Sequence, residues 1–183
     1  MDNSTTYIAL LRGINVGGHR PLKMTRLQEM FTSMGFKDVS TYIQSGNVIF
    51  DAPSRNQQSL STQIAKQIAV TFDYNIPVIV YSAHELKTIF EQFPFAEKEG
   101  WKHYITFLPA QPPENKIATL EALSSDIEHF KVGNRAVYIQ VNKQVNKKAR
   151  FSNKFIQQQL DTSATNRNLK SVRKLVQLSS AHS

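Results

Sequence analysis

Apolar residues in the first half of the chain form both short continuous runs and stripes with helical spacing. The runs predict strands at 7–14, 39–44, 47–51 and 76–81. Apolar residues repeated every three or four positions predict amphipathic helices at 25–34 and 54–72. The resulting order of strand, helix, strand, strand, helix, strand is the split βαβ, or ferredoxin-like, motif.

The second half repeats this order of elements without repeating the residues. Strands are predicted at 103–108, 127–132, 135–141 and 163–168, and helices at 112–123 and 151–160. Further stripes predict a connecting helix after Ser82 and a terminal helix at 169–178. We therefore expect an α+β protein of two tandem ferredoxin-like domains (alpha-beta plaits). The first, residues 1–93, contains the connecting helix, and the second, residues 94–183, contains the terminal helix.

Short turn and cap signals add detail to this plan. The pairs Ser45-Gly46 and Gly133-Asn134 each suit a two-residue hairpin, because glycine tolerates positive φ. Thr25 with Gln28 fits a capping box, which predicts a helix that begins just after Thr25.

Composition removes several classes of chemistry. Cysteine is absent, which excludes disulfide scaffolds, thiol catalysis and cysteine-ligated zinc. The five histidines have no metal-binding spacing, so neither a metal nor a cofactor is expected. No apolar run is long enough for a membrane span, and the first residues lack the apolar stretch of a signal peptide, so we expect a cytoplasmic protein that does not enter a membrane.

Charge is unevenly distributed along the chain. Residues 1–130 contain 11 Lys/Arg and 13 Asp/Glu, a net charge of −2, whereas residues 131–183 contain 11 Lys/Arg and one acid, a net charge of +10. A basic region of this kind attracts polyanions, with an affinity that falls steeply with salt. The alternative is an ordinary solvated face.

The first candidate site is the Gly-rich segment RGINVGGHR at 12–20. Gly13 and Gly18 have the spacing of a phosphate-binding loop, but His19 and Arg20 replace its lysine and hydroxyl residue, which argues against a nucleotide-hydrolysing P-loop. Glycine-rich turns expose backbone N–H groups that bind anions, and Arg12, Arg20 and Lys23 lie nearby in sequence. The alternative is a turn that needs glycine for its backbone angles alone.

The second candidate is the segment YIQSGNV at 42–48, which is otherwise a hairpin turn. In a ferredoxin-like sheet the end of the first strand lies beside the start of the third. We therefore expect one polar pocket that contains Arg12, Asn15, the Gly17–Gly18 amides and Asn47.

The third candidate is the segment TNRN at 165–168 with the helix that follows it. Lys170, Arg173 and Lys174 are neighbours on a helix surface and would form a basic stripe, which could also be no more than a solvated face.

At RGINVGG, YIQSGNVIF and TNRNLKSVRKL the chain resembles the bacterial family catalogued as domain of unknown function 1697. The resemblance implies that this chain is a cytosolic protein with two tandem ferredoxin-like domains. It implies no activity. This chain departs from the family pattern at Leu169, where relatives commonly have Trp, and at Ser171, where they commonly have Thr. If the Trp stacks on a ligand in relatives, Leu169 argues against such stacking here. If the Trp only packs between domains, Leu169 is a modest change of the core.

The leading hypothesis is a cytosolic binding protein for an anionic, phosphate-bearing ligand at the motif loops. Its ligand-binding residues would be Arg12, Asn15, Gly17, Gly18, Lys23, Asn47, Arg167, Asn168 and Lys174. One alternative is a small-molecule enzyme that uses His19 or His103 as a proton carrier. The others are a nucleic-acid-binding module that uses the region from Lys131 to Lys174, and a protein-interaction or dimerisation module that uses exposed sheet edges.

Overall fold

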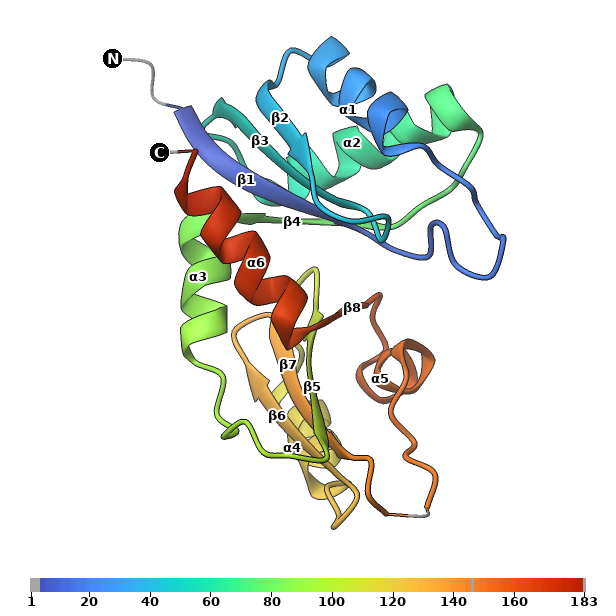
Figure 1. Ribbon diagram of the computed structural model, residues 1–183, viewed down its shortest axis with the longest axis vertical. Helices are drawn as coiled ribbons and strands as arrows, with labels where there is room; N and C mark the ends of the chain where they lie inside the picture. Colours follow the sequence, from blue (N-terminus) through green and yellow to red (C-terminus); the bar gives the residue numbers. More distant parts are fainter. Residues whose placement is uncertain (1–3, 146, 183) are drawn as a thin grey trace. The chain divides into compact units, whose positions relative to one another are not determined.

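The computed structural model describes residues 4–145 and 147–182. The described chain is an α+β protein with two four-stranded antiparallel sheets and helices between the strands (Figure 1). It divides into two compact units, Met1–Lys87 with Lys174–Ser183, and Thr88–Arg173. These divisions fall inside α3 (Ala83–Glu91) and α6 (Leu169–Ser180), whereas the sequence placed a single boundary after residue 93.

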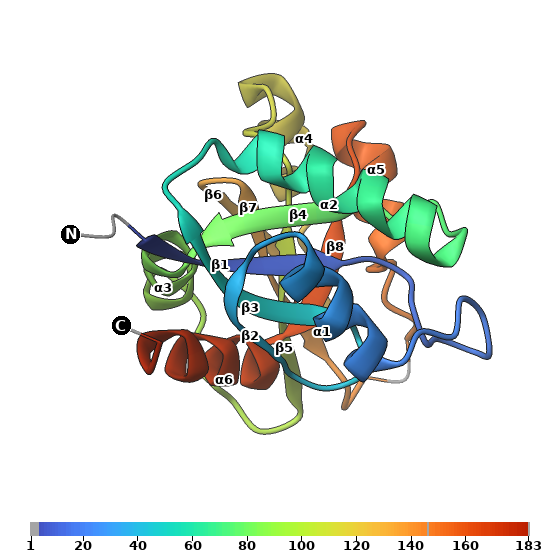
Figure 2. The same ribbon diagram turned by 90° about the horizontal axis from the view of Figure 1, so that it is seen from above.

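The sheet of the first unit has the strand order β2-β3-β1-β4. Its strands are β1 (Ser4–Leu11), β2 (Lys37–Thr41), β3 (Asn47–Pro53) and β4 (Val78–Ser82). Helices α1 (Met24–Ser33) and α2 (Gln57–Phe72) lie on one face of this sheet, as Figures 1 and 2 show.

The first core lies between that face and the two helices. Alternate β1 residues, Tyr7, Ala9 and Leu11, pack with Phe31 of α1 and Leu60 of α2. The intervening residues of β1 are also fully buried. Burial on both faces explains why the sequence of β1 is a continuous apolar run and not an alternating one.

The second unit contains β5 (Trp101–Phe107), β6 (Glu128–Gly133), β7 (Ala136–Asn142) and β8 (Thr165–Asn168) in the order β6-β7-β5-β8. Helices α4 (Glu114–Ala122) and α5 (Asn153–Leu160) contribute Leu120, Ile156 and Leu160 to a core with Phe130 and Ile139. Numbered from the first strand of each unit, both sheets have the same strand order. This arrangement is consistent with two tandem ferredoxin-like domains.

Strand β8 is shorter than its neighbour. It pairs only with Tyr104–Phe107 of β5. The first three residues of β5, Trp101 to His103, therefore have β7 as a neighbour on one side and no paired residue of β8 on the other.

Three local predictions were wrong. The hairpin between β2 and β3 has five connecting residues, 42–46, because Ile43 and Gly46 both take positive φ and form a wider loop. The β6–β7 loop has two residues, but they are Asn134 and Arg135, one position later than predicted. Lys23 is the N-cap of α1 without a side-chain cap, and the Gln28 amide donates to Val39 O instead of closing a capping box.

Beyond α6 the chain contacts the sheet of the first unit. His182 Nε2 lies 3.3 Å from Ser40 Oγ, and His182 Nδ1 lies 3.9 Å from Asp51 Oδ1. His182 belongs to the part of the chain, Lys174–Ser183, that falls in the first compact unit although it follows the second unit in sequence.

Candidate functional site

The Gly-rich loop connects β1 to α1 and ends in a tight turn that projects from the first unit (blue in Figure 2). His19 N donates to Val16 O at 2.9 Å, and the two residues between them, Gly17 and Gly18, have φ of 57° and 78°. Positive φ at both central positions is typical of a type I′ turn, which glycine forms without strain. All four residues of this turn are exposed, so the tip of the loop is open to solvent.

Asn15 closes the base of this loop. Its Nδ2 donates to Leu22 O and to Gln44 O, both at 2.9 Å, and its Oδ1 accepts from Leu22 N at 2.8 Å. The contact with Gln44 joins the Gly-rich loop to the loop at 42–46. The structure thus brings the two predicted segments together, and it uses the Asn15 side chain to hold them.

Asn47 lies beneath the same end of the sheet. It pairs with Leu10 across β1 and β3, it is fully buried, and its Nδ2 donates to Tyr42 O at 2.8 Å and to Ser45 Oγ at 3.0 Å. A buried amide with these partners shapes the 42–46 loop from inside. Asn47 therefore lies beside the end of β1, but it is buried, and of the residues predicted to share one polar pocket only Asn15 lines the cleft at this end of the sheet.

Arg12 follows β1 and has a positively charged neighbour. Burial lowers the pKa of Arg12, and the nearby charge of Arg20 lowers it further. The Arg20 guanidinium passes beside Gly13, where an added Cβ would lie 3.6 Å from Arg20 Nη1. Among the described residues no carboxylate forms an ion pair with either arginine. The base of the loop therefore holds two cations that no carboxylate of the described residues balances in an ion pair.

A cleft of about 400 Å³ lies beside the same loop. Its lining residues are Asn15, Pro21, Leu22, Lys23, Arg26, Gln44 and Phe72. The Arg26 guanidinium lies 5.4 Å from the centre of the Phe72 ring, which is a cation–π distance. Two cations and no carboxylate line this cleft, so its charge favours an anion.

The residues of the terminal motif have different surroundings from one another. Arg167 is only 7% exposed, and its Nη1 donates to Thr165 Oγ1 at 2.9 Å and to Asn166 O at 2.8 Å. Burial lowers the pKa of Arg167 to about 10. Asn168 caps α6 by accepting from Ser171 N at 2.8 Å, and Lys174 is exposed. Arg167, Asn168 and Lys174 therefore do not form one continuous exposed surface.

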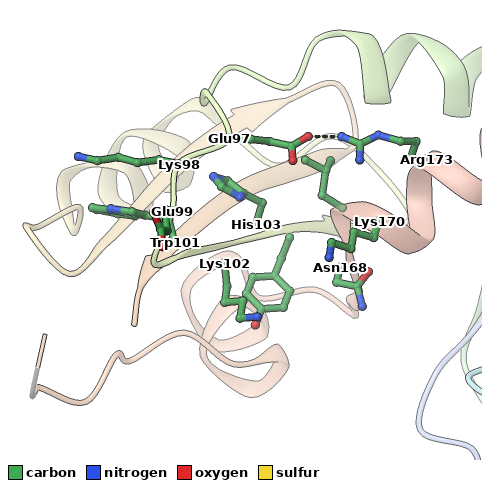
Figure 3. Close-up of a pocket in the computed structure, with 11 residues that line it drawn as sticks. Glu97, Lys98, Glu99, Trp101, Lys102, His103, Asn168, Lys170 and Arg173 are labelled. Carbon is green, nitrogen blue, oxygen red and sulfur yellow. Dashed lines mark hydrogen bonds and ion pairs between the residues drawn. The ribbon is translucent and has the colours of Figure 1, made fainter. Parts of the chain in front are cut away.

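A second cavity, of about 520 Å³, lies within the second unit (Figure 3). Its lining residues are Glu97, Lys98, Glu99, Trp101, Lys102, His103, Tyr104, Asn168, Leu169, Lys170 and Arg173. The sequence did not predict this cavity. Its one available signal was Trp101, a large amphipathic side chain that is the only tryptophan of the chain.

The two histidines considered as proton carriers differ in their surroundings. His19 is exposed at the tip of the Gly-rich loop. His103 lines the second cavity, and its Nε2 is buried with no hydrogen-bond partner among the described residues. Within residues 4–145 and 147–182, no group of three His, Asp or Glu side chains is arranged to hold a metal ion. No helix in the same ranges is both long and apolar enough to cross a membrane.

Comparison with known proteins agrees with the fold. The chain is similar to the solved structure of the conserved bacterial protein SP0830 from Streptococcus pneumoniae, with a TM-score of 0.73 and 23% sequence identity over 96% of this chain and 99% of that chain. At this identity the likeness shows the fold alone. The search of curated proteins gave no match. A family model described as "Protein of unknown function (DUF1697)" matches residues 4–138, and the chain therefore belongs to the DUF1697 family.

Proposed function

We propose that the protein binds a small phosphate-bearing ligand at the Gly-rich loop of its first unit, and that each unit is a ferredoxin-like domain. The observation that carries this proposal is the Arg12–Arg20 pair. The positive charge of Arg20 is close enough to lower the pKa of Arg12, so the two guanidinium groups repel each other, and burial adds a desolvation cost to the charge of Arg12. A phosphate group would offset both the repulsion and the desolvation cost, because guanidinium groups bind phosphate oxygens through paired charge-assisted hydrogen bonds.

The surroundings of the pair support the same ligand class. Lys23 and Arg26 line the adjacent cleft, and the exposed Gly17–Gly18 turn has backbone N–H groups near the surface. Asn15 and Asn47 act as the framework of this site and not as its ligands, because their amides bond within the two loops. The Phe72 ring gives the cleft one apolar wall.

Thermal unfolding with and without ligand tests this proposal. The panel consists of inorganic phosphate, pyrophosphate and adenosine monophosphate. At least one of these compounds should raise the unfolding temperature. At a concentration of 100 times its dissociation constant, the stabilisation should be about 2.7 kcal/mol. Arg12→Ala should abolish the rise. The same variant without ligand should be as stable as the wild-type protein or more stable, because it removes a repulsion.

Arg55→Ala is the matched control, since Arg55 is an exposed arginine of the same unit that lies outside both the Gly-rich loop and the lining of the cleft. It should keep the full ligand response. If no compound in the panel raises the unfolding temperature, or if Arg12→Ala and Arg55→Ala respond alike, the proposal is wrong.

A second candidate function is binding of single-stranded nucleic acid by the second unit. A groove of about 660 Å³ at the start of α5 has Lys148, Arg150 and Lys154 in its lining together with Phe151 and Phe155. No carboxylate lines it. Cations that follow a phosphate backbone, combined with aromatic rings on which bases stack, are the usual elements of such sites.

A further inference from the structure

The cavity of the second unit exists because a strand ends early. β8 stops at Asn168, opposite Tyr104, and the chain turns into α6 at the next residue. The beginning of β5 is therefore left open on that side. Three segments form the walls around this opening: residues 97–99, the first four residues of β5, and the stretch from Asn168 through the first turn of α6 (Figure 3).

Its lining has an excess of positive charge. Four cationic side chains, Lys98, Lys102, Lys170 and Arg173, face two carboxylates. One carboxylate, that of Glu97, is already engaged, because Arg173 Nη2 donates to it (dashed line in Figure 3). Three lysines then remain against Glu99, an excess of two positive charges. Within the described ranges, neither Lys102 nor Lys170 has an ion-pair partner. The charge therefore favours an anionic ligand.

The cavity also has a flat aromatic side chain in a fixed position. The Trp101 ring stacks on His129 with ring centres 5.4 Å apart and an angle of 15° between the planes. The His129 ring is itself held by a hydrogen bond between its Nδ1 and Gln140 Nε2 at 2.6 Å. Leu169, buried in the wall, adds apolar surface. A planar ring would gain both stacking and apolar burial here.

His103 supplies a polar atom without a partner. Its Nε2 is buried and makes no hydrogen bond within the described protein, although the ring packs edge-on against Phe93 at 5.7 Å. Buried polar groups are hydrogen-bonded in the great majority of cases, so such an atom at a cavity wall indicates a missing partner. A polar atom of a bound molecule would provide that partner.

From these features we propose that the cavity binds a small planar aromatic or heteroaromatic molecule that carries a carboxylate or a phosphate. The ring lies against Trp101 and Leu169, the acidic group is held by Lys102 and Lys170, and a polar atom bonds His103 Nε2. A volume of about 520 Å³ lies within the range of small-molecule sites. This site is separate from the Gly-rich loop and does not depend on the function proposed for it.

The fluorescence of Trp101 gives a direct test, because no other tryptophan contributes to the signal. The full-length protein is titrated with two matched pairs, nicotinate with nicotinamide and adenosine monophosphate with adenosine, and with inorganic phosphate. We expect a saturable change in Trp101 emission with the anionic member of at least one pair, and a dissociation constant at least tenfold weaker for its neutral counterpart. The nicotinate arm reports a carboxylate ligand and the adenosine monophosphate arm a phosphate ligand. Equal responses to charged and neutral members, or no saturable response in either pair, would overturn the proposal.

Two variants locate the binding. Lys170→Gln should weaken binding of the responding anion about tenfold, and His103→Asn should weaken it as well. Lys174→Gln makes the same charge change one helical turn further along α6, at an exposed residue outside the cavity lining, and should bind like the wild-type protein. Lys170 is also exposed, so its replacement should not affect folding even if the change at His103 does. Equal affinities for Lys170→Gln and Lys174→Gln would contradict the assigned site.

Discussion

Gly46 shows how one residue fixes the end of the first sheet. It is buried with φ of 82°, and an added Cβ would lie 2.7 Å from Leu11 Cβ and 2.8 Å from Ile14 Cδ1. Leu11 N also donates to Gly46 O at 2.8 Å, so the two backbones cannot move apart without loss of that bond. The loop that approaches Arg12 therefore requires glycine both for its backbone angle and for space.

We predict that Gly46→Ala lowers the free energy of unfolding by about 2–4 kcal/mol, because left-handed strain adds to overpacking of the core. Gly18→Ala is the matched control, since Gly18 has φ of 78° but nothing lies within 4 Å of an added Cβ. Strain alone should then cost about 1 kcal/mol. Urea unfolding measures both variants, and equal losses would show that contact with Leu11 and Ile14 does not matter.

Several polar residues of the motifs make hydrogen bonds within the protein that account for their side chains. Asn47 is fully buried, Asn168 caps a helix, and Arg167 bonds to its own strand. From the sequence, these residue types in glycine-rich or basic surroundings predicted ligand contacts. A sequence does not distinguish an amide that binds a ligand from one that supports a loop, because both need the same donors and acceptors.

At the scale of elements, Tyr138 joins β7 to the end of α3. Its hydroxyl donates to Ile89 O at 2.8 Å, and burial raises the pKa of Tyr138 to about 12. The pKa in the folded state is therefore higher than the ordinary value of 10.0. The stability that this difference provides is fully present below pH 10 and is lost as the pH rises through 12.

Replacement of Tyr138 by Phe should remove this alkaline loss. At neutral pH the variant should be less stable by about 1 kcal/mol, because Ile89 O loses its donor. As the pH rises above 10, the wild-type protein should lose about 2–3 kcal/mol that the variant keeps, so the difference should reverse. The lowered pKa of Arg167 acts in the opposite direction, but it is present in both proteins and cancels. Urea unfolding over this pH range measures the difference, and parallel pH profiles would contradict the prediction.

The types of most elements could be predicted from the sequence, and their connections could not. Apolar spacing identified both α2 and the buried strands, because packing of side chains on one face sets that spacing. The loop at 42–46 depends on contacts of Asn15 and Asn47 with residues elsewhere in the chain. The cavity of the second unit depends on the early end of β8, which only the pairing of the sheet reveals.

At the scale of the whole molecule, the last 53 residues differ in net charge from the rest of the chain. Residues 131–183 carry a net charge of +10, and residues 1–130 carry −2. Part of the basic character is used internally, since the buried Glu128 accepts from Arg150 Nε at 2.9 Å and from Phe151 N at 2.9 Å. Lys148 and Lys154 line the groove at α5, and neither has an ion-pair partner in the described parts of the chain. These two lysines are charges that a polyanion in this groove would meet.

If the groove binds single-stranded nucleic acid, replacement of Lys148 and Lys154 by Gln should weaken binding of oligothymidylate in low salt. It should also reduce the slope of log affinity against log salt by about 1.4, because each phosphate contact on a single strand contributes about 0.7. Arg55→Gln with Lys66→Gln removes the same charge from exposed positions of the first unit and should leave the slope unchanged. Fluorescence anisotropy over a salt series gives both quantities. If both double variants lower the affinity equally, the attraction comes from net charge and not from the groove. If heparin binds as tightly as oligothymidylate and Phe155→Leu has no effect, base stacking is absent and the groove recognises polyanions in general.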